Sequence, residues 1–314
     1  MCTAISCGAY AGRNLDIDKS YGGEVIITPR NYKITFKEEA CIHSHYSMIG
    51  IGLNVDEYPL YFDAVNEKGL YIASLNYVGN AKYFTIKPNK VNLAPYELIL
   101  HILAKCKDIT EAKREFERIN LINIPFNDTL PLAELHFFIA DKCSSVTVES
   151  DENGLNIYNN PTDVLTNNPS FPIHLFNLNN YQGLSPRPVK NFLCDKLTLQ
   201  EYSHGLGALG LPGDLSSSSR FIRATFHKFN SQDEDGIAKI MRLLSTVAMP
   251  DGSVKTNTGY ERTEYTSAVD LERCIYCYRT YDSLCPYAVT LSEDTLDANA
   301  LITENLQRKK EPLC

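Results

Sequence analysis

Apolar residues in the first part of the chain occur in short runs separated by glycine, proline and asparagine. The runs cover residues 3–6, 12–16, 25–28, 32–36, 48–53 and 70–76, and each has the length of a β-strand. Gly8 lies between the first two runs, which predicts a hairpin. Further runs of this kind cover residues 134–140, 145–150, 155–158, 265–270, 274–280 and 287–291.

Two pairs of helical patterns interrupt these strands. Pro95 opens the first helix, predicted over 96–106, and Thr110 is the candidate N-cap of the second, over 110–119. Two more are predicted over 220–229 and 235–247. Blocks of antiparallel strands with paired helices favour two stacked sheets covered by helices over an alternating βαβ fold. Since no repeat or long linker divides the sequence, we expect one domain over residues 2–314.

Composition narrows the functional classes. The formal net charge is −8 and no dense Lys/Arg block occurs, which argues against nucleic acid as a partner. The start of the chain lacks the pattern of a secretory signal, and no segment has the unbroken apolar length of a membrane span. We therefore expect a cytoplasmic protein with no membrane partner, in which most of the ten cysteines are reduced and buried.

Cys2 is the residue that suggests chemistry. An initiator Met is preferentially removed when the next side chain is small, so a mature chain beginning at Cys2 is expected. Unperturbed α-amines and thiols both titrate at about pH 8. A thiolate with its own α-amine as base is the pair that covalent catalysis needs. Many proteins begin Met-Cys without consequence, so the dipeptide alone does not establish catalysis.

The neighbouring strand adds two charged candidates. The hairpin would return residues 12–16 beside Cys2, which places Arg13 and Asp16 near it. A fixed positive charge near sulfur favours the thiolate, and a carboxylate near the α-amine would orient it. Taken alone, an Arg and an Asp three positions apart usually form only a surface pair.

Seven motifs in order along the chain resemble the choloylglycine hydrolase family, which comprises bile salt hydrolases and penicillin V acylases. They are Met-Cys-Thr at the start, Gly-Arg-Asn-Leu-Asp at 12–16, Thr-Pro-Arg-Asn-Tyr at 28–32, Asn-Glu-Lys-Gly-Leu at 66–70, Leu-Thr-Asn-Asn-Pro at 165–169, Gly-Leu-Pro-Gly-Asp at 210–214 and Ser-Arg-Phe-Ile-Arg at 219–223. The resemblance extends from residue 2 to about residue 300. It implies an α+β fold, the four-layer αββα N-terminal-nucleophile hydrolase fold with two stacked antiparallel sheets.

The resemblance also implies an amidohydrolase for linear amides, with a catalytic set carried over by motif. The set comprises Cys2, Arg13, Asp16, Asn76, Asn167 and Arg220. By this resemblance Cys2 attacks the amide carbonyl and water resolves the thioester. Asn167 and the backbone N–H of Asn76 form the oxyanion hole. Asp16 orients the α-amine, and the two arginines steady the thiolate. No metal or organic cofactor is required.

Some of these residues also have a structural interpretation. Asn76 ends a predicted strand, and Asn167 precedes Asn-Pro, so either could mark a turn. Arg220 lies in the first turn of a predicted helix, where the helix dipole does not favour a cation. A partner close to Arg220 is therefore expected.

Asn at position 76 indicates the substrate. Bile salt hydrolases are similar to this chain in having Asn there, whereas penicillin V acylases tend to have Tyr, so conjugated bile salts are the expected substrate and penicillin V the main rival. Five loop residues are candidates for a pocket around the steroid, although core packing explains any single one equally well: Leu15, Tyr21, Leu60, Phe126 and Leu130. Residues 203–207 are a candidate for shaping the preference at the amino acid end. The family is commonly a homotetramer, which is expected here too.

A hypothesis from another class stays open, namely a non-catalytic thiol protein that binds a ligand or senses redox state. Cys274 and Cys277 have the spacing of a redox or zinc motif, but no second Cys pair or nearby His cluster completes a site. The segment is predicted as a strand, in which these two side chains, three positions apart, would face opposite ways. His43 and His45 would fall on one strand face if this segment were a strand, but they lack further ligands. We expect no metal at either place.

Overall fold

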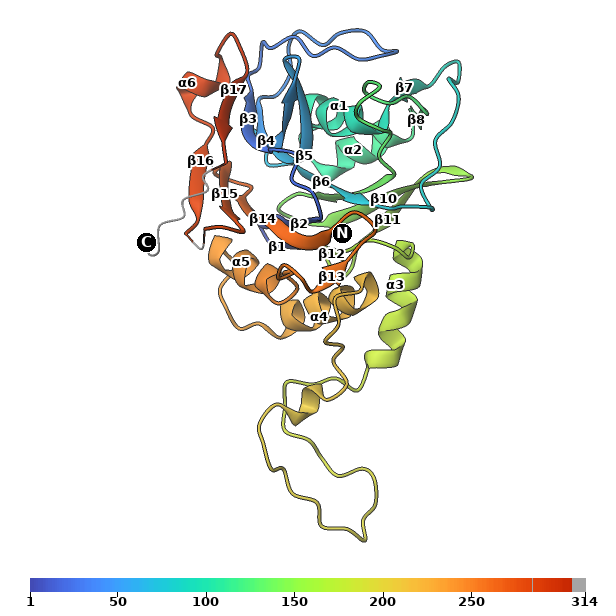
Figure 1. Cartoon of the computed structure of the whole chain (residues 1–314), viewed down its shortest axis with the longest axis vertical. Helices are drawn as coiled ribbons and strands as arrows, with labels where there is room; N and C mark the ends of the chain where they lie inside the picture. The colour runs from blue at the N-terminus through green and yellow to red at the C-terminus, as the bar shows by residue number, and fades with distance from the viewer. Residues whose placement is uncertain (284, 307–314) are drawn as a thin grey trace.

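Two antiparallel sheets lie face to face at the centre of the molecule, and helices cover the outer face of each (Figure 1). The computed structural model describes residues 1–283 and 285–306. One hydrophobic core fills the space between the sheets and continues under one pair of helices, and a second core lies beneath the other pair. The four-layer αββα arrangement expected from the sequence is confirmed.

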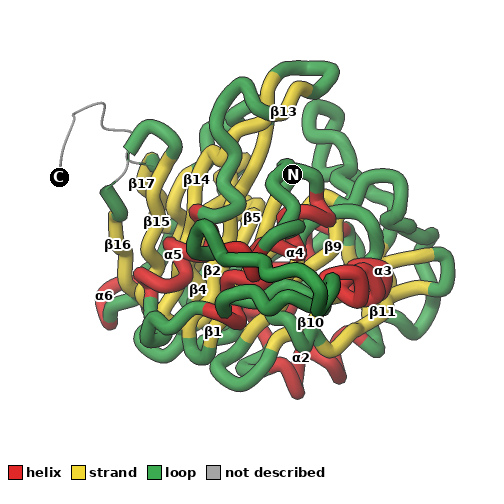
Figure 2. The backbone as a smooth tube through the Cα atoms, turned by 90° about the horizontal axis from the view of Figure 1, so that it is seen from below, coloured by secondary structure: helices red, strands yellow, loops and turns green. Residues whose placement is uncertain are grey.

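The first sheet holds the N-terminal strand of the chain. In spatial order its strands are β12 (Val164–Leu165), β1 (Cys2–Cys7), β2 (Tyr10–Ile17), β14 (Tyr260–Asp270), β15 (Ile275–Thr280) and β16 (Tyr287–Thr290), with β13 (Val254–Lys255) paired to β14. In Figure 2 the paired strands of this sheet run alongside one another. Every position of β1 is buried, because one face meets the second sheet and the other meets helices.

The second sheet contributes the opposite wall of the central core. In spatial order its strands are β11 (Gly154–Asn159), β10 (Ser145–Asp151), β9 (Leu135–Ala140), β6 (Tyr71–Asn76), β5 (Tyr58–Asn66), β4 (Met48–Val55), β3 (Glu24–Thr28) and β17 (Ile302–Asn305). A separate short parallel pair is formed by β7 (Val91–Leu93) and β8 (Ile119–Leu121).

Two helices cover each sheet. On the second sheet these are α1 (Leu98–Lys105) and α2 (Ile109–Phe116), and on the first sheet they are α4 (Ser217–Asn230) and α5 (Ile237–Ser245). The remaining helical segments are α3 (Phe171–Asn177), α6 (Glu293–Leu296), η1 (Pro95–Glu97), η2 (Leu178–Tyr181) and η3 (Leu206–Ala208). Among the described residues, no helix combines the length and apolarity that crossing a membrane requires.

Most predicted elements are confirmed with small shifts at their ends. Pro95 opens η1, which leads into α1, and the predicted helices over 220–229 and 235–247 correspond to α4 and α5. Gly8 has a positive φ of 52° in the turn between β1 and β2, as the hairpin requires. Cys7, Cys274 and Cys277 are buried free thiols, as expected for most cysteines.

Several sequence-based assignments were wrong. Residues 43–45 lie in no strand, so the strand face expected for His43 and His45 does not form. Residues 32–36 lie outside both sheets and form only one isolated bridge, between Ile34 and Ile42. The central strand β5 was missed, because Pro59 and Asp63 interrupt its apolar pattern. The N-cap of α2 is Asp108 and not Thr110, since the Asp108 side chain accepts from the Glu111 N–H at 2.9 Å.

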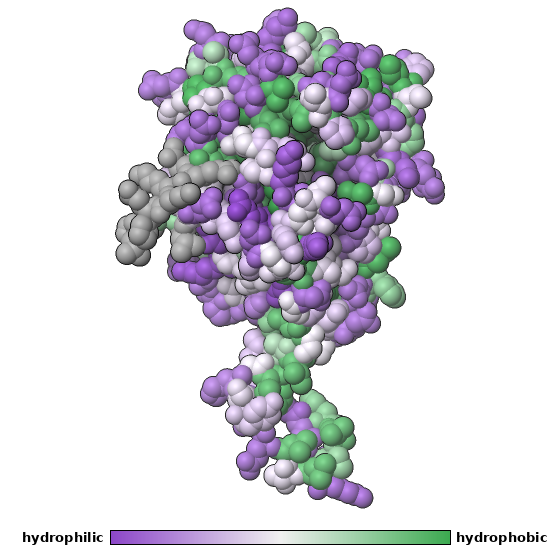
Figure 3. All heavy atoms as spheres, in the orientation of Figure 1, coloured by the Kyte–Doolittle hydropathy of each residue, from purple (hydrophilic) through white to green (hydrophobic). Residues whose placement is uncertain are grey.

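An arm formed by residues 185–207 projects far from the layered body (Figure 1). It begins and ends where the Ser185 N–H donates to the Gly207 carbonyl at 2.8 Å. Apolar side chains lie along it (Figure 3), with Phe192 89% exposed and Tyr202 87% exposed. Among residues 1–283 and 285–306, nothing covers these two side chains.

A buried carboxylate, Asp63 on β5, joins the two sheets. It accepts hydrogen bonds from Tyr71 on β6 in its own sheet at 3.0 Å, and from three hydroxyls of the facing sheet. These are Tyr265 at 2.5 Å, Ser267 at 2.9 Å and Tyr276 at 2.7 Å. Four hydroxyl donors compensate for removing the carboxylate from water. This explains how a central strand carries an acidic residue with no exposed surface.

Replacing Asp63 tests this link between the sheets. Asp63→Asn keeps the shape but removes the charge that the four hydroxyls solvate, so the free energy of unfolding is expected to fall by about 2–3 kcal/mol. Denaturant unfolding followed by circular dichroism measures the change. Tyr276→Phe removes one donor and is expected to cost only about 1 kcal/mol. An Asp63→Asn variant as stable as the parent would contradict the assignment.

Gly12 permits the close approach of β2 to β14. A Cβ at this position would meet the Ser267 carbonyl oxygen at 2.2 Å and the Ile240 Cγ2 at 2.8 Å. Gly12→Ala is therefore expected to lower the free energy of unfolding by roughly 1–3 kcal/mol. Gly183→Ala is the matched control, because nothing lies within 4 Å of its Cβ. Equal thermal stability of the two variants would show that the backbones separate without cost.

Candidate active site

Cys2 opens β1, and its side chain faces a cavity of about 570 Å³ between the sheets. Cys2 pairs with Leu15, and Arg13 pairs with Ala4 two positions further along β1. Cys2 and Ala4 point to the same face, so the hairpin places Arg13 diagonally beside the sulfur. Arg13 Nη2 donates to Cys2 Sγ at 2.7 Å. The expected neighbourhood of Cys2 and Arg13 is therefore present.

The Arg13 guanidinium has no exposed surface. Its Nη1 donates to the carbonyls of Phe62 at 2.8 Å and Ser74 at 2.7 Å, both in the second sheet. Burial alone would lower the pKa of Arg13, but the nearby Cys2, Tyr265 and Asp63 together raise that pKa. Arg13 is therefore a fixed positive charge beside the sulfur.

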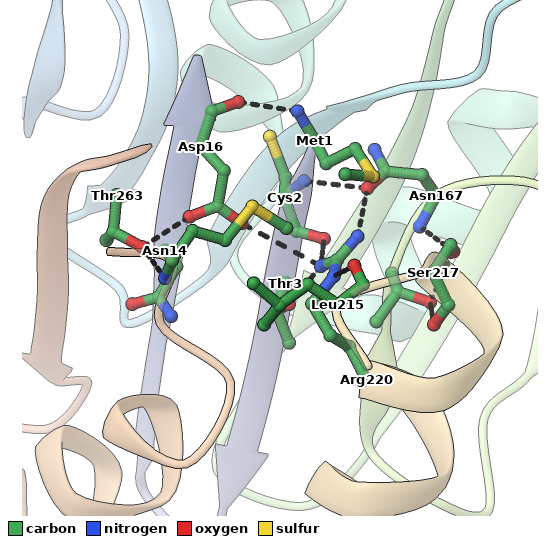
Figure 4. A network of polar contacts seen from close by, with 12 residues as sticks. Met1, Cys2, Thr3, Asn14, Asp16, Asn167, Leu215, Ser217, Arg220 and Thr263 are labelled. Carbon is green, nitrogen blue, oxygen red and sulfur yellow. Dashed lines mark hydrogen bonds and ion pairs between the residues drawn. The ribbon is translucent and has the colours of Figure 1, made fainter. Parts of the chain in front are cut away.

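Asp16 lies on β2 beside the start of the chain. Its Oδ1 accepts from the Thr263 hydroxyl at 2.6 Å, whereas its Oδ2 is buried without a hydrogen-bond partner. Oδ2 lies 3.8 Å from Arg220 Nη1 (Figure 4). Burial raises the pKa of Asp16 above its ordinary value, and the positive charge of Arg220 opposes that rise. An acceptor thus remains open next to the N-terminal residues.

Asn167 connects the N-terminus to the second sheet. Its Oδ1 accepts from the Cys2 N–H at 2.7 Å, and its Nδ2 donates to the Asn76 carbonyl at 2.8 Å. Ser217 and His174 hold its backbone, because the Asn167 N–H donates to Ser217 Oγ and the Asn167 carbonyl lies 2.8 Å from His174 Nε2. The two asparagines expected in the site are therefore in contact with each other.

Arg220 lies in the first turn of α4, where the helix dipole does not favour a cation, and it has the close partners expected there. Its Nη1 donates to the Cys2 carbonyl and to Thr3 Oγ1, both at 2.6 Å, and its Nη2 donates to Asn167 Oδ1 at 2.8 Å (Figure 4). Burial lowers the pKa of Arg220, and the nearby Asp16 carboxylate opposes this. Arg220 thereby links the chain start to Asn167.

The cavity beside Cys2 has mostly apolar walls. The five side chains expected at a substrate pocket all line it: Leu15, Tyr21, Leu60, Phe126 and Leu130. Tyr96 and Ile99 extend this wall and were not predicted, because they fall in the stretch predicted as a helix over 96–106. None of residues 203–207 lines the cavity, since they lie on the arm.

Two further site residues escaped sequence analysis. Glu261, the second residue of β14, also lines the cavity and pairs with the Met1 α-ammonium at 2.8 Å. His174 positions Asn167 from α3, and burial lowers its pKa to about 4, so its imidazole is neutral near pH 7. Neither position has a local sequence signal. In residues 1–283 and 285–306, no cluster of His, Cys, Asp and Glu suits a metal ion.

Known proteins match this chain over nearly its whole length. A family model described as linear amide C–N hydrolases, choloylglycine hydrolase family, matches residues 2–304. A bile salt hydrolase/transferase of Lactiplantibacillus plantarum is 45% identical, with 99% of this chain and 98% of that protein covered. A conjugated bile acid hydrolase of Lactobacillus gasseri is 36% identical, over 96% of this chain and 100% of the relative.

Solved structures agree with the sequence comparison. The C2A mutant of the conjugated bile acid hydrolase from Clostridium perfringens superposes with a TM-score of 0.92 at 33% identity, covering 98% of both chains. Penicillin V acylase from Agrobacterium tumefaciens shares the fold, with a TM-score of 0.75 at 19% identity over 98% of this chain and 92% of that one. The chain is an amide hydrolase and belongs to the choloylglycine hydrolase family.

Proposed function

We propose that this protein hydrolyses the amide bond of glycine- or taurine-conjugated bile salts through Cys2. The observation that carries the proposal is the Cys2 sulfur, held 2.7 Å from the fixed charge of Arg13 at the wall of an apolar cavity. Two bacterial relatives, a bile salt hydrolase/transferase and a conjugated bile acid hydrolase, support the substrate class. A thiolate beside a guanidinium is an activated nucleophile.

Removal of Met1 completes the machinery in this proposal. The Cys2 nitrogen then becomes a free α-amine that keeps Asn167 Oδ1 as an acceptor. The open Asp16 Oδ2 is available to a second proton of that amine. The amine takes the thiol proton as sulfur attacks the carbonyl carbon, and passes it to the leaving nitrogen when the C–N bond breaks. Water then hydrolyses the thioester.

Asn167 Nδ2 and the Asn76 backbone N–H are the proposed oxyanion donors. Their closeness supports this role, because Asn167 Nδ2 already lies 2.8 Å from the Asn76 carbonyl oxygen and has a second proton to donate. His174 and Ser217 hold the Asn167 backbone from either side. Such fixed donors stabilise charge that develops in the transition state, and each contributes about 10²–10³ in rate.

The cavity supports a rigid apolar acyl group. Its walls include residues of β2, β5 and the loop that carries Phe126 and Leu130, and the exposed Tyr21 also lines it. A steroid buries its apolar face on such walls, and the amide then reaches Cys2. Asn76 at the cavity favours a bile salt over penicillin V, which remains the rival substrate because an acylase for it shares the fold.

The thioester has a second possible acceptor. The relative from Lactiplantibacillus plantarum is described as a hydrolase/transferase. If an amine attacks the thioester carbon, the C–S bond breaks, a new amide forms and the amine proton returns to Cys2. Transfer is thus a second candidate activity of the same site.

The cytoplasmic location expected from the sequence stays a prediction.

Turnover of three amides by the purified protein tests the function. Glycocholate and taurocholate are expected to be hydrolysed faster than penicillin V, with released amine and cholate measured by mass spectrometry. Intact mass should show loss of Met1, and Cys2→Ala should reduce hydrolysis by at least 10³-fold, the order expected when a catalytic nucleophile is removed. Cys7→Ala is the matched control, since Cys7 lies at the other end of β1.

Two results would contradict this function. Full activity in Cys2→Ala would require another nucleophile. A protein that binds cholate conjugates but retains Met1 and turns over none of the three amides would instead be a non-catalytic thiol protein.

The arm supports the proposal of a homotetramer. Its exposed apolar side chains include Phe192 and Tyr202, and single chains rarely leave such a surface uncovered. Sedimentation is expected to give the mass of four subunits for the parent protein and a smaller assembly for the double variant Phe192→Ser/Tyr202→Ser. A monomeric parent, or a variant that assembles unchanged, would show that the arm does not join subunits.

A further inference from the structure

His136 is a buried imidazole on β9 with an acceptor on each side of its ring. Its Nε2 lies 2.8 Å from the Thr166 carbonyl oxygen, and its Nδ1 lies 3.2 Å from Glu149 Oε1. A carbonyl oxygen can only accept, so Nε2 carries a proton and donates it. Since a bare ring nitrogen and a carboxylate oxygen would repel each other, a further proton lies between Nδ1 and Glu149. The ring is therefore fixed from both sides.

The Thr166 carbonyl and the Asn167 N–H belong to one planar peptide unit. His136 holds the carbonyl end of this unit, and Ser217 Oγ accepts from the N–H end at 2.8 Å (Figure 4). His174 Nε2 contacts the next carbonyl, that of Asn167 itself, at 2.8 Å. Three backbone polar groups next to the Asn167 Cα thus have fixed partners. The direction in which the Asn167 side chain leaves the backbone is set by these contacts.

A single carboxylate, Glu149 on β10, supports both imidazoles. Besides facing His136 Nδ1, its Oε1 accepts from the Phe171 N–H at 2.9 Å. Phe171 is the first residue of α3, the helix that carries His174 one turn later. Because Glu149 is buried, water does not compete for either contact. The two imidazoles that hold the backbone around Asn167 therefore have a common support.

The His136 ring also contacts the strand that carries Asn76. Leu75 pairs with His136 in the ladder between β6 and β9, so Tyr77 lies diagonally across on the same face. The rings of Tyr77 and His136 stack, with centroids 4.5 Å apart and planes 6° apart. The Tyr77 N–H donates to the Glu134 carbonyl at 2.7 Å, which extends the pairing of the two strands by one residue.

This pairing gives the Asn76 N–H its direction. Because the Tyr77 N–H faces β9, the N–H of Asn76 points to the other side of β6. The Ser74 carbonyl points to that side too and accepts from Arg13 Nη1 at 2.7 Å. The Asn76 carbonyl does the same and accepts from Asn167 Nδ2 at 2.8 Å. The stack on Tyr77 therefore fixes the strand end from which the Asn76 donor projects.

We infer that His136 is a positioning residue of the oxyanion hole, which sets Asn76 and Asn167 against each other. It does not line the cavity, and it acts through the Thr166 peptide unit and the Tyr77 ring. The inference deepens the proposed function and rests on it, because the two donors are those proposed there. Donors that are already in place need no rearrangement when charge develops on the carbonyl oxygen. Loss of His136 should therefore lower kcat and leave KM nearly unchanged.

Steady-state hydrolysis of glycocholate by three variants tests the inference. His136→Phe keeps a ring to stack on Tyr77 but cannot donate to Thr166, so kcat is expected to fall about 10- to 100-fold with KM within about twofold. His136→Gln retains a donor at the position of Nε2 and is expected to keep kcat within about threefold. His101→Phe is the matched control and should leave kcat unchanged, because His101 is also buried and pairs with Glu115 at 2.7 Å, but on α1.

A double-mutant cycle separates positioning from a general loss of structure. Asn167→Ala removes one donor and is expected to cost about 10²–10³ in kcat. In that background His136→Phe should lower kcat by less than about twofold, because the group that His136 positions is gone. The same fold-loss from His136→Phe in both backgrounds would overturn the inference. So would a His136→Gln enzyme as slow as His136→Phe.

Crystal structures of the variants test the same point without turnover. The Asn167 amide of His136→Phe is expected to move by about 1 Å or to occupy two conformers, whereas His101→Phe should leave it in place. His136→Asn takes the place of His136→Phe if the latter does not fold, since its shorter amide corresponds to Nδ1 and cannot reach Thr166. A parent that hydrolyses none of the three amides would defeat the proposed function, and a displaced Asn167 would still support the positioning role. An unmoved Asn167 would overturn that role whatever the parent hydrolyses.

Discussion

The Arg13 guanidinium lies between the two sheets with no exposed surface. Because water cannot reach it, the surrounding protein must supply its hydrogen-bond acceptors and compensate its charge. Two carbonyls of the second sheet and the Cys2 sulfur accept its hydrogen bonds. The Asp63 carboxylate adds a compensating charge nearby, and it is itself solvated by hydroxyls of both sheets. The sheets can therefore stack only in the register that brings these groups together. That same register places the sulfur at the wall of the cavity.

Part of the candidate site could be predicted from the sequence, because three of its residues lie on a single hairpin. Cys2, Arg13 and Asp16 lie on one hairpin, so strand alternation and pairing are enough to bring them together. Asn76, Asn167 and Arg220 come from distant segments, and only the family resemblance identified them. Their contacts depend on how β6, the segment after β12 and α4 pack, which local patterns do not encode.

The residues that prediction missed share a different property. Asp63, His174 and Glu261 are polar positions whose use depends on partners far along the chain. In a sequence, an acidic residue inside an apolar run indicates a break in a strand, which is why β5 was missed. Conversely, the run over 32–36 has a strand-like composition but finds only a single bridge partner. Pairing, and not composition, decides whether such a segment becomes part of a sheet.

The chain that still carries Met1 has a nearly complete site. Arg13, Asn167 and Arg220 are already buried and hydrogen-bonded around Cys2, so their desolvation is a cost of folding and not of catalysis. One acceptor, Asp16 Oδ2, has no hydrogen-bond partner in this state. Met1 meanwhile satisfies the Asp16 backbone and Glu261. Its removal would exchange those contacts for an α-amine, for which the open acceptor is the proposed partner. In the proposed mechanism, the N-terminal residue would then act as a placeholder that occupies this position while the site folds.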